Sequence, residues 1–146
     1  MIADPAVRRP GWPYWLIAAL ALLWNAFGCL DFTMTAARNP DYLAQVPPEV
    51  IDWIDGAPTW TMAAWALGVG GGLLGALCLL GRLRWAVAAY VASLLGLAAN
   101  HAWQFASGMP ASMKTPGSLT LMACIWIAAL AQLWYAVKKR REGVLR

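Results

Sequence analysis

Four long apolar segments constrain the fold of this chain more than any other feature of its sequence. They cover about residues 14–37, 59–80, 85–107 and 118–137. As a helix, each is long enough to cross a hydrocarbon core about 30 Å thick. Lipid offers the backbone no hydrogen-bond partners, so such segments cross a membrane as α-helices. The sequence therefore predicts an all-α polytopic membrane protein, an antiparallel bundle of four transmembrane helices in a single domain over residues 1–146.

The composition agrees with a membrane protein. The chain is 61% hydrophobic and 12% charged, whereas soluble domains have about 45–50% apolar and about 25% charged residues. It also contains ten tryptophans, a residue that is enriched at the membrane–water interface. The formal net charge is +4, but no basic face alternates with exposed aromatic residues as a nucleic-acid surface requires.

The distribution of Lys and Arg predicts the orientation of the bundle. Two of the eleven basic residues, Arg38 and Lys114, follow the ends of the first and third segments. The other nine lie at the chain ends or in the turn at 81–84, and cytoplasmic loops carry such an excess. Both termini are therefore predicted to be cytoplasmic, with a periplasmic loop over residues 39–58. Within this loop, Pro47, Pro48 and Glu49 open a short amphipathic segment whose apolar residues are Val50, Ile51, Trp53 and Ile54 and whose acidic residues are Glu49, Asp52 and Asp55. It predicts either a short interfacial helix on the outer face or an ordered linker anchored by Trp53.

Small residues form a close-packing pattern in the second apolar segment. Gly68 and Gly72, and likewise Gly71 and Gly75, are four residues apart. This spacing lets two helix backbones approach closely in a membrane. We expect the four glycines to mediate helix packing, either inside one bundle or between protomers.

Asp31 is the only acidic residue inside any of the four apolar segments. A carboxylate at membrane depth is costly and suggests a polar cavity, a partner group or a function. Trp24, Gly28, Asp31 and Thr35 follow one another along a single helical stripe. In the third segment, Asn100 and Gln104 lie on a second stripe, with His101 on its flank.

Both stripes are predicted to lie in the outer half of the bundle at similar depth. If they face each other, they form an outward-facing polar pocket that could bind a cation or a small polar solute, or carry protons. Burial and the partner charge would then shift the pKa values of the carboxylate and the imidazole. The polar groups of this predicted site are Asp31, Asn100, His101 and Gln104, and its aromatic walls are Trp24, Trp65, Trp103 and Trp126.

Two other interpretations of these residues remain open. Asp31 could reach the outer headgroups or be neutralised by Arg38, while Asn100, His101 and Gln104 simply join helices, each bond contributing about 1 kcal/mol. Alternatively, the polar stripe could form a contact surface for another subunit.

Metal and catalytic chemistry have little support in the sequence. Cys29, Cys78 and Cys124 each lie in an apolar segment and are expected to be buried thiols. A single histidine is a weak basis for a zinc site, and a bis-histidine haem is excluded within one chain. No hydrolase or metalloprotease motif is present. We therefore expect no metal and no cofactor. The only enzymatic chemistry left open is Asp31/His101 acid–base catalysis on a lipid-like substrate.

The stretch WNAFGCLDFTMTAARNPDYLAQ, residues 24–45, carries a family resemblance together with the proline-rich loop and aromatic helix that follow it. It resembles small bacterial four-helix inner-membrane proteins of unestablished function, which are often labelled "sugar transporter". The similarity covers about residues 24–84. It implies that Asp31, Asn25, Asn100 and Gln104, with tryptophan platforms, contact a sugar. His101 belongs to no motif of that family.

Two functions from different classes follow from the sequence. The first is a multi-pass protein of the bacterial inner membrane that binds or transports a small polar solute. A transporter of this size is expected to be a homo-oligomer. The second is a non-catalytic accessory or scaffold subunit of a larger membrane complex. In both cases membrane lipids surround the helices.

Overall fold

The computed structural model describes residues 10–146, and in this range the chain forms helices and no strand. Four helices are long and apolar enough to cross a membrane, which confirms the prediction of a multi-pass helical protein. They are α1 (Trp12–Ala36), α4 (Thr59–Leu80), α5 (Trp85–Ala106) and α6 (Pro116–Arg141). The short elements are α2 (Pro40–Leu43), α3 (Pro48–Asp55) and the 3-10 helix η1 (Ala111–Lys114).

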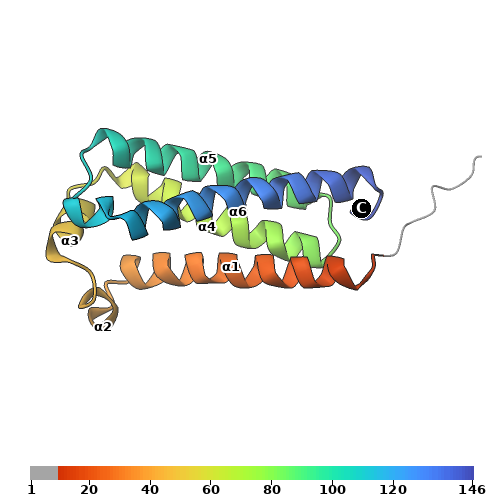
Figure 1. Cartoon of the computed structure of the whole chain (residues 1–146), viewed down its shortest axis with the longest axis horizontal. Helices are drawn as coiled ribbons and strands as arrows, with labels where there is room; N and C mark the ends of the chain where they lie inside the picture. The colour runs from red at the N-terminus through yellow and green to blue at the C-terminus, as the bar shows by residue number, and fades with distance from the viewer. Residues whose placement is uncertain (1–9) are drawn as a thin grey trace, which may run out of the picture.

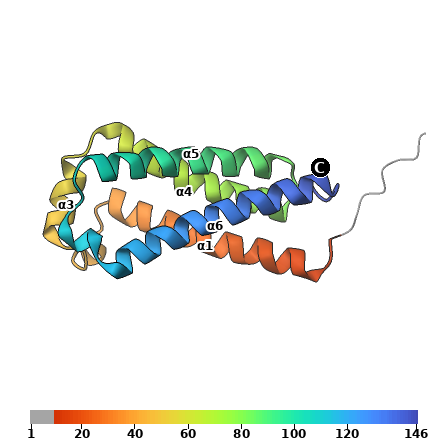
Figure 2. The ribbon, with the colours of Figure 1, turned by 45° about the horizontal axis from the view of Figure 1, so that its top comes forward.

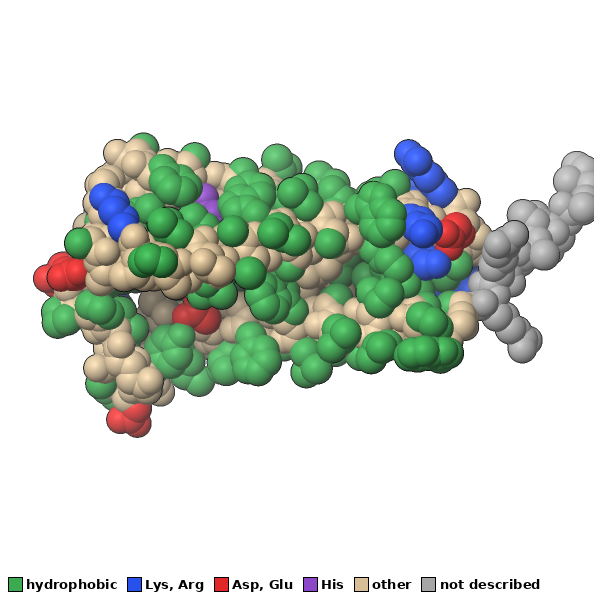
Figure 3. Space-filling view, in the orientation of Figure 1, with side chains coloured by type: hydrophobic (Ala, Val, Ile, Leu, Met, Phe, Trp, Pro, Cys, Tyr) green, Lys and Arg blue, Asp and Glu red, His purple; other side chains and the backbone are tan. Residues whose placement is uncertain are grey.

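The four long helices run side by side along the molecule (Figure 1). One end of the bundle carries α2, α3 and η1 and is called the loop end. The other end carries the start of α1, the α4–α5 turn and the C-terminus, and is called the basic end. Hydrophobic side chains cover the length of the visible face, and Lys and Arg side chains gather mainly at the basic end (Figure 3). Arg8 and Arg9, which contribute to the predicted orientation, lie outside the described residues.

Local sequence signals explain where the long helices begin and end. α1 starts at Trp12 because Pro13 fits the first turn of a helix. Thr115 caps the start of α6, where its Oγ1 accepts a hydrogen bond from the Ser118 N–H at 3.2 Å. α6 continues through its basic residues to Arg141, four residues beyond the predicted end, because cations are favourable at a helix C-terminus.

The closest helix contact in the bundle joins α4 and α5. A Cβ added at Gly96 of α5 would lie 2.5 Å from the Gly68 nitrogen and 2.6 Å from the Ala64 oxygen, both backbone atoms of α4. A Cβ at Gly71 would lie 2.9 Å from the Ser93 nitrogen. These glycines therefore let the two backbones touch, and Ser93 Oγ adds a hydrogen bond to the Gly68 carbonyl at 2.5 Å.

The other two predicted packing glycines lie against side chains. Gly72 faces the side-chain amide of Asn25 on α1, and Gly75 faces the ring of Tyr90 on α5. All four predicted packing glycines of α4 thus adjoin another helix of the same chain.

The outer helices are held less closely. α1 packs against α4, and α6 packs against α5. α6 crosses over α1 at an angle, so that the two helices diverge on either side of the crossing (Figure 2). The result is a central α4–α5 pair with one further helix attached to each member.

The C-terminal residues close the basic end. The Arg84 N–H donates to the Arg146 carbonyl at 2.6 Å, and the Arg146 N–H donates to the Arg82 carbonyl at 2.8 Å. Val144 and Leu145 are buried in the same cluster as Leu79 and Tyr90. The tail is therefore fastened to the α4–α5 turn.

Candidate functional site

Asp31 forms its hydrogen bond at the loop end of α1. The Tyr42 hydroxyl, on α2, donates to the Asp31 carboxylate. Asn39 sets the position of Tyr42, because its Oδ1 caps α2 by accepting from the Tyr42 N–H at 3.0 Å. The hydrogen bond to Asp31 is the largest cause that raises the pKa of Tyr42 to about 12, followed by burial and the negative charge of Asp31.

Arg38 pairs with a different carboxylate. It follows α1 in the left-handed backbone region, at φ 55°, and its guanidinium forms an ion pair with Asp55 at the end of α3. Both side chains are about half exposed. The alternative in which Arg38 neutralises Asp31 is therefore wrong. Asp31 contacts Tyr42 of α2 and Arg38 contacts Asp55 of α3, and these two contacts hold α2 and α3 against the end of α1.

Asn100 and Gln104 form a short chain of hydrogen bonds between α5 and α4. The Asn100 side-chain amide donates to the Thr61 carbonyl at 3.1 Å. The Gln104 amide donates in turn to Asn100 Oδ1 at 2.5 Å. Asn100 is only 8% exposed, and a buried amide without these partners would be costly. The pair therefore joins the loop-end halves of the two central helices.

His101 forms its hydrogen bond with α6. The indole N–H of Trp126 donates to His101 Nδ1 at 2.9 Å. An indole nitrogen can only donate, so Nδ1 accepts and carries no proton. Trp126, expected as an aromatic wall, is thus a hydrogen-bond partner that attaches α6 to α5.

Asn25 forms the polar contact between α1 and α6. Its side-chain amide donates to Gln132 Oε1 at 2.7 Å and also to the Ala21 carbonyl at 2.7 Å. Asn25 lies at the middle of α1 and Gln132 in the second half of α6, and these two helices cross at an angle (Figure 2).

The predicted aromatic residues occupy three different places. Trp103 stacks on Trp53 of α3 with ring centroids 4.6 Å apart. Trp65 meets Phe32 of α1 edge to face at 5.2 Å. Trp24 lines a groove between α1 and α6.

The structure thus divides the predicted pocket into separate pairs. Between residues 10 and 146, no hydrogen bond or ion pair links Asp31 to His101. The physical reason is the order of the helices, since α4 packs against both α1 and α5. The expected carboxylate–imidazole pair is therefore corrected to Asp31–Tyr42 and His101–Trp126.

The described residues also lack a cluster suited to a metal. Nowhere in that part of the chain do three or more His, Cys, Asp or Glu side chains come together in a way that could hold an ion. All three cysteines are free thiols; Cys78 is buried as expected, Cys29 is half-buried, and Cys124 is exposed on the surface of α6.

The sequence pointed to most of the polar residues that form hydrogen bonds between helices, but it did not identify the residues with which they pair. Tyr42 lies in the stretch that carries the family resemblance, but nothing in the sequence marks it as the partner of Asp31, and Thr61 takes part only through its backbone carbonyl. Gln132 is the only strongly polar side chain in the interior of α6, which could have marked it as a partner for another membrane amide. Gly96 lies four residues from Asn100, yet only its place opposite Gly68 reveals its packing role.

Comparisons with models of known protein families, with curated protein sequences and with solved protein structures give no match for this chain.

Proposed function

We propose that this protein is a non-catalytic accessory or scaffold subunit of a larger membrane complex. The observation that carries the proposal is the pairing of polar groups at membrane depth. Asn25, Asn100, Gln104 and His101 each share a hydrogen bond with another group of the chain. Such bonds hold helices together in lipid, and three of the four join different helices.

A second candidate function is binding of a small polar solute at the loop end. It is favoured by Trp53, whose buried indole N–H has no hydrogen-bond partner while its ring stacks on Trp103. Trp53 of α3 thus has a spare N–H donor, and its stacking partner Trp103 is next to Gln104 in α5. An indole donor and an amide side chain together have the chemistry that binding of a sugar requires. The family resemblance at residues 24–84 supports the same candidate.

The proposed setting is a bacterial inner membrane with the basic end in the cytoplasm. Arg82, Arg84 and residues 138–141 support this orientation through the excess of Lys and Arg in cytoplasmic loops. Both termini would then be cytoplasmic, and α3 would lie as an interfacial helix on the periplasmic side. A reporter enzyme that is active only in the periplasm, fused after Arg146, should be inactive; an active fusion would reverse the orientation.

Unfolding measurements with a sugar probe separate the two functions. The free energy of unfolding in detergent micelles is measured for the wild type, Gln104→Ala and Trp103→Phe, with and without glucose. Under the subunit hypothesis, Gln104→Ala costs about 1 kcal/mol and glucose changes none of the values. Glucose stabilisation of the wild type that Trp103→Phe abolishes would favour the solute-binding candidate.

The subunit hypothesis has a test of its own. The tagged chain, extracted from its native membrane in a mild detergent, should migrate in native electrophoresis as an assembly larger than the purified chain in the same micelle. Migration at the size of the purified chain would contradict it.

A further inference from the structure

A lateral groove opens between α1 and α6 in the half of the bundle nearer the basic end. Its volume is about 470 Å³. The floor is Leu79 of α4, and Gln132, which accepts a hydrogen bond from Asn25 of α1, also lines the groove. The walls are almost entirely apolar and include Ile17, Leu20 and Trp24 of α1 with Ala131, Trp134 and Tyr135 of α6.

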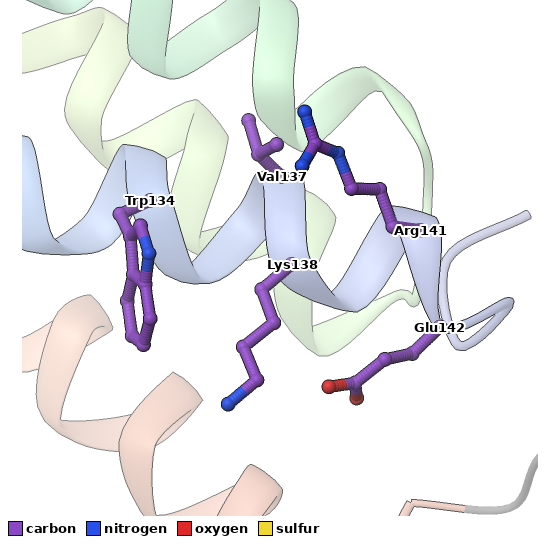
Figure 4. A pocket seen from close by; sticks show the side chains of 5 residues that line it. All are labelled: Trp134, Val137, Lys138, Arg141 and Glu142. Atoms are coloured by element: carbon purple, nitrogen blue, oxygen red, sulfur yellow. The ribbon is translucent and has the colours of Figure 1, made fainter.

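A second, smaller cavity lies next to this groove, toward the end of α6. It has a volume of about 270 Å³ and is lined by Trp134, Val137, Lys138, Arg141 and Glu142. Trp134 borders both cavities. Trp134 and Lys138 extend toward α1, whereas Arg141 points to the opposite side (Figure 4). The apolar groove therefore ends beside a cationic rim.

Two neighbouring lysines at this end of α6 differ in whether they form an ion pair. Lys139 pairs with Glu142 at 2.6 Å, so this pair adds no net charge. Lys138 is exposed, and its Nζ lies 5.1 Å from the centre of the Trp134 ring. Lys138 thus presents an ammonium at the mouth of the groove.

We infer that this groove binds one acyl chain of an anionic phospholipid, whose phosphate contacts Lys138. The polar and apolar parts of this site are arranged in the same order as the phosphate and the acyl chain of a phospholipid. A cation and an indole lie at headgroup level, where Trp and Lys are favourable, and the apolar groove extends from them toward the bundle centre.

The length of the groove distinguishes an acyl chain from a partner helix. The distance along α6 from Lys138 to Ala128, the deepest lining residue of this helix, is about 15 Å at 1.5 Å per residue. This equals about half of a 30 Å hydrocarbon core, the depth of one leaflet. A transmembrane partner helix would need a groove through both leaflets, but this groove has no lining residue beyond Trp24 on α1 or Ala128 on α6, both near the middle of their helices.

Native mass spectrometry of the purified full chain tests the inference. The delipidated protein in detergent is titrated with phosphatidylglycerol or phosphatidylcholine, and bound lipids are counted by mass. We expect one phosphatidylglycerol to be retained at concentrations where phosphatidylcholine is not. Equal retention of the two lipids would overturn the assignment of Lys138 to the phosphate.

Two matched pairs of variants locate the site. Lys138→Gln should weaken phosphatidylglycerol binding about fivefold, whereas Arg140→Gln, which removes the same charge outside both cavities, should have a clearly smaller effect. Ala131→Trp fills the groove and should weaken binding about tenfold. Ala123→Trp, at an exposed position of α6 outside the groove, should leave binding unchanged.

Several outcomes would overturn the inference. Unchanged binding in both Lys138→Gln and Ala131→Trp would show an adventitious lipid. Equal effects of Lys138→Gln and Arg140→Gln would show general attraction to a basic surface. Dissociation of a protein assembly by Ala131→Trp, with lipid retention unchanged, would assign the groove to a partner helix. Lys138 is exposed, so its replacement reports on binding without disturbing the fold.

Discussion

The α4–α5 interface and the α1–α6 face are built in opposite ways. About a third or more of the spanning stretches of α4 and α5 is buried inside the chain, against 11% for α1 and 6% for α6. Glycines bring the backbones of α4 and α5 into contact, whereas α1 and α6 leave an open groove beside their crossing. The chain thus combines a closely packed central pair with two outer helices that mostly face the surroundings.

This difference separates two ways of holding helices in lipid. Lipid tails are as apolar as the side chains, so no hydrophobic force drives helices together, and close packing of small residues has to do so. α4 and α5 use that packing along much of their length. α6 instead uses single polar contacts, Asn25–Gln132 with α1 and His101–Trp126 with α5, which leave space elsewhere between α1 and α6. Space of this kind is available to a lipid or a partner.

The largest effect is expected when the central interface is forced apart. Gly96→Ala places a methyl group 2.5 Å from a backbone nitrogen of α4, and neither backbone can yield without separating the helices. We expect a loss of about 1–3 kcal/mol in the free energy of unfolding, measured by denaturant titration in mixed micelles.

Gly70→Ala is the matched control for this prediction. Gly70 also lies in the middle of a central helix, but nothing would contact its Cβ within 4 Å. Alanine is a better helix former than glycine by about 0.5–1 kcal/mol, so this variant should be as stable as the wild type or more stable. Equal losses in the two variants would show that the α4–α5 contact is not the source of stability.

The four apolar segments predicted the helices because hydrophobic length is a local property of the sequence. α4 has the predicted bounds, 59–80, and α5 ends one residue before its predicted end, 107. The glycine spacing of α4 also pointed to close packing, although it did not reveal that Gly96 is the nearest partner of Gly68.

The candidate site was harder to predict because it depends on which helices are neighbours. The stripes through Asp31 and Asn100 were placed at the same depth, but depth does not tell whether two helices touch. With α4 between α1 and α5, Asp31 meets Tyr42 and His101 meets Trp126. Helix order is a property of the whole bundle, and the sequence contains no local signal for it.

A smaller effect is expected at the α1–α6 crossing. Asn25→Ala and Gln132→Ala remove the two partners of one hydrogen bond, and a double-mutant cycle isolates their coupling. We expect a coupling free energy of about 0.6 kcal/mol, the average for hydrogen bonds between membrane helices. The control cycle combines Asn25→Ala with Gln104→Ala, which share no partner, and should give zero coupling. A coupling of 2 kcal/mol or more, above the roughly 1.7 kcal/mol maximum of such bonds, would mean that α1 and α6 are joined as firmly as the central pair.

The smallest effect on stability is expected where α2 contacts the loop end of α1, because the Tyr42–Asp31 hydrogen bond is exposed and solvent weakens its net contribution. Tyr42 has a pKa raised to about 12 from an ordinary value of 10.0, first because it donates to the Asp31 carboxylate. A group with a raised pKa in the folded state stabilises fully below its unfolded pKa, and this contribution is lost as the pH rises through the folded value. The contribution of this contact to stability should therefore be constant below about pH 10 and should disappear between about pH 10 and pH 12.

Asp31→Asn removes the charge and should return the pKa of Tyr42 toward 10.0. Carbon-13 NMR of labelled tyrosine measures this pKa, with Tyr42→Phe identifying the signal. Asp41→Asn removes the same charge beside Tyr42 but no hydrogen bond, and should leave its pKa close to the wild-type value. Equal shifts of the Tyr42 pKa in the two variants would show that nearby negative charge in general, and not the hydrogen bond to Asp31, raises this pKa. That result would contradict the contact between α2 and Asp31.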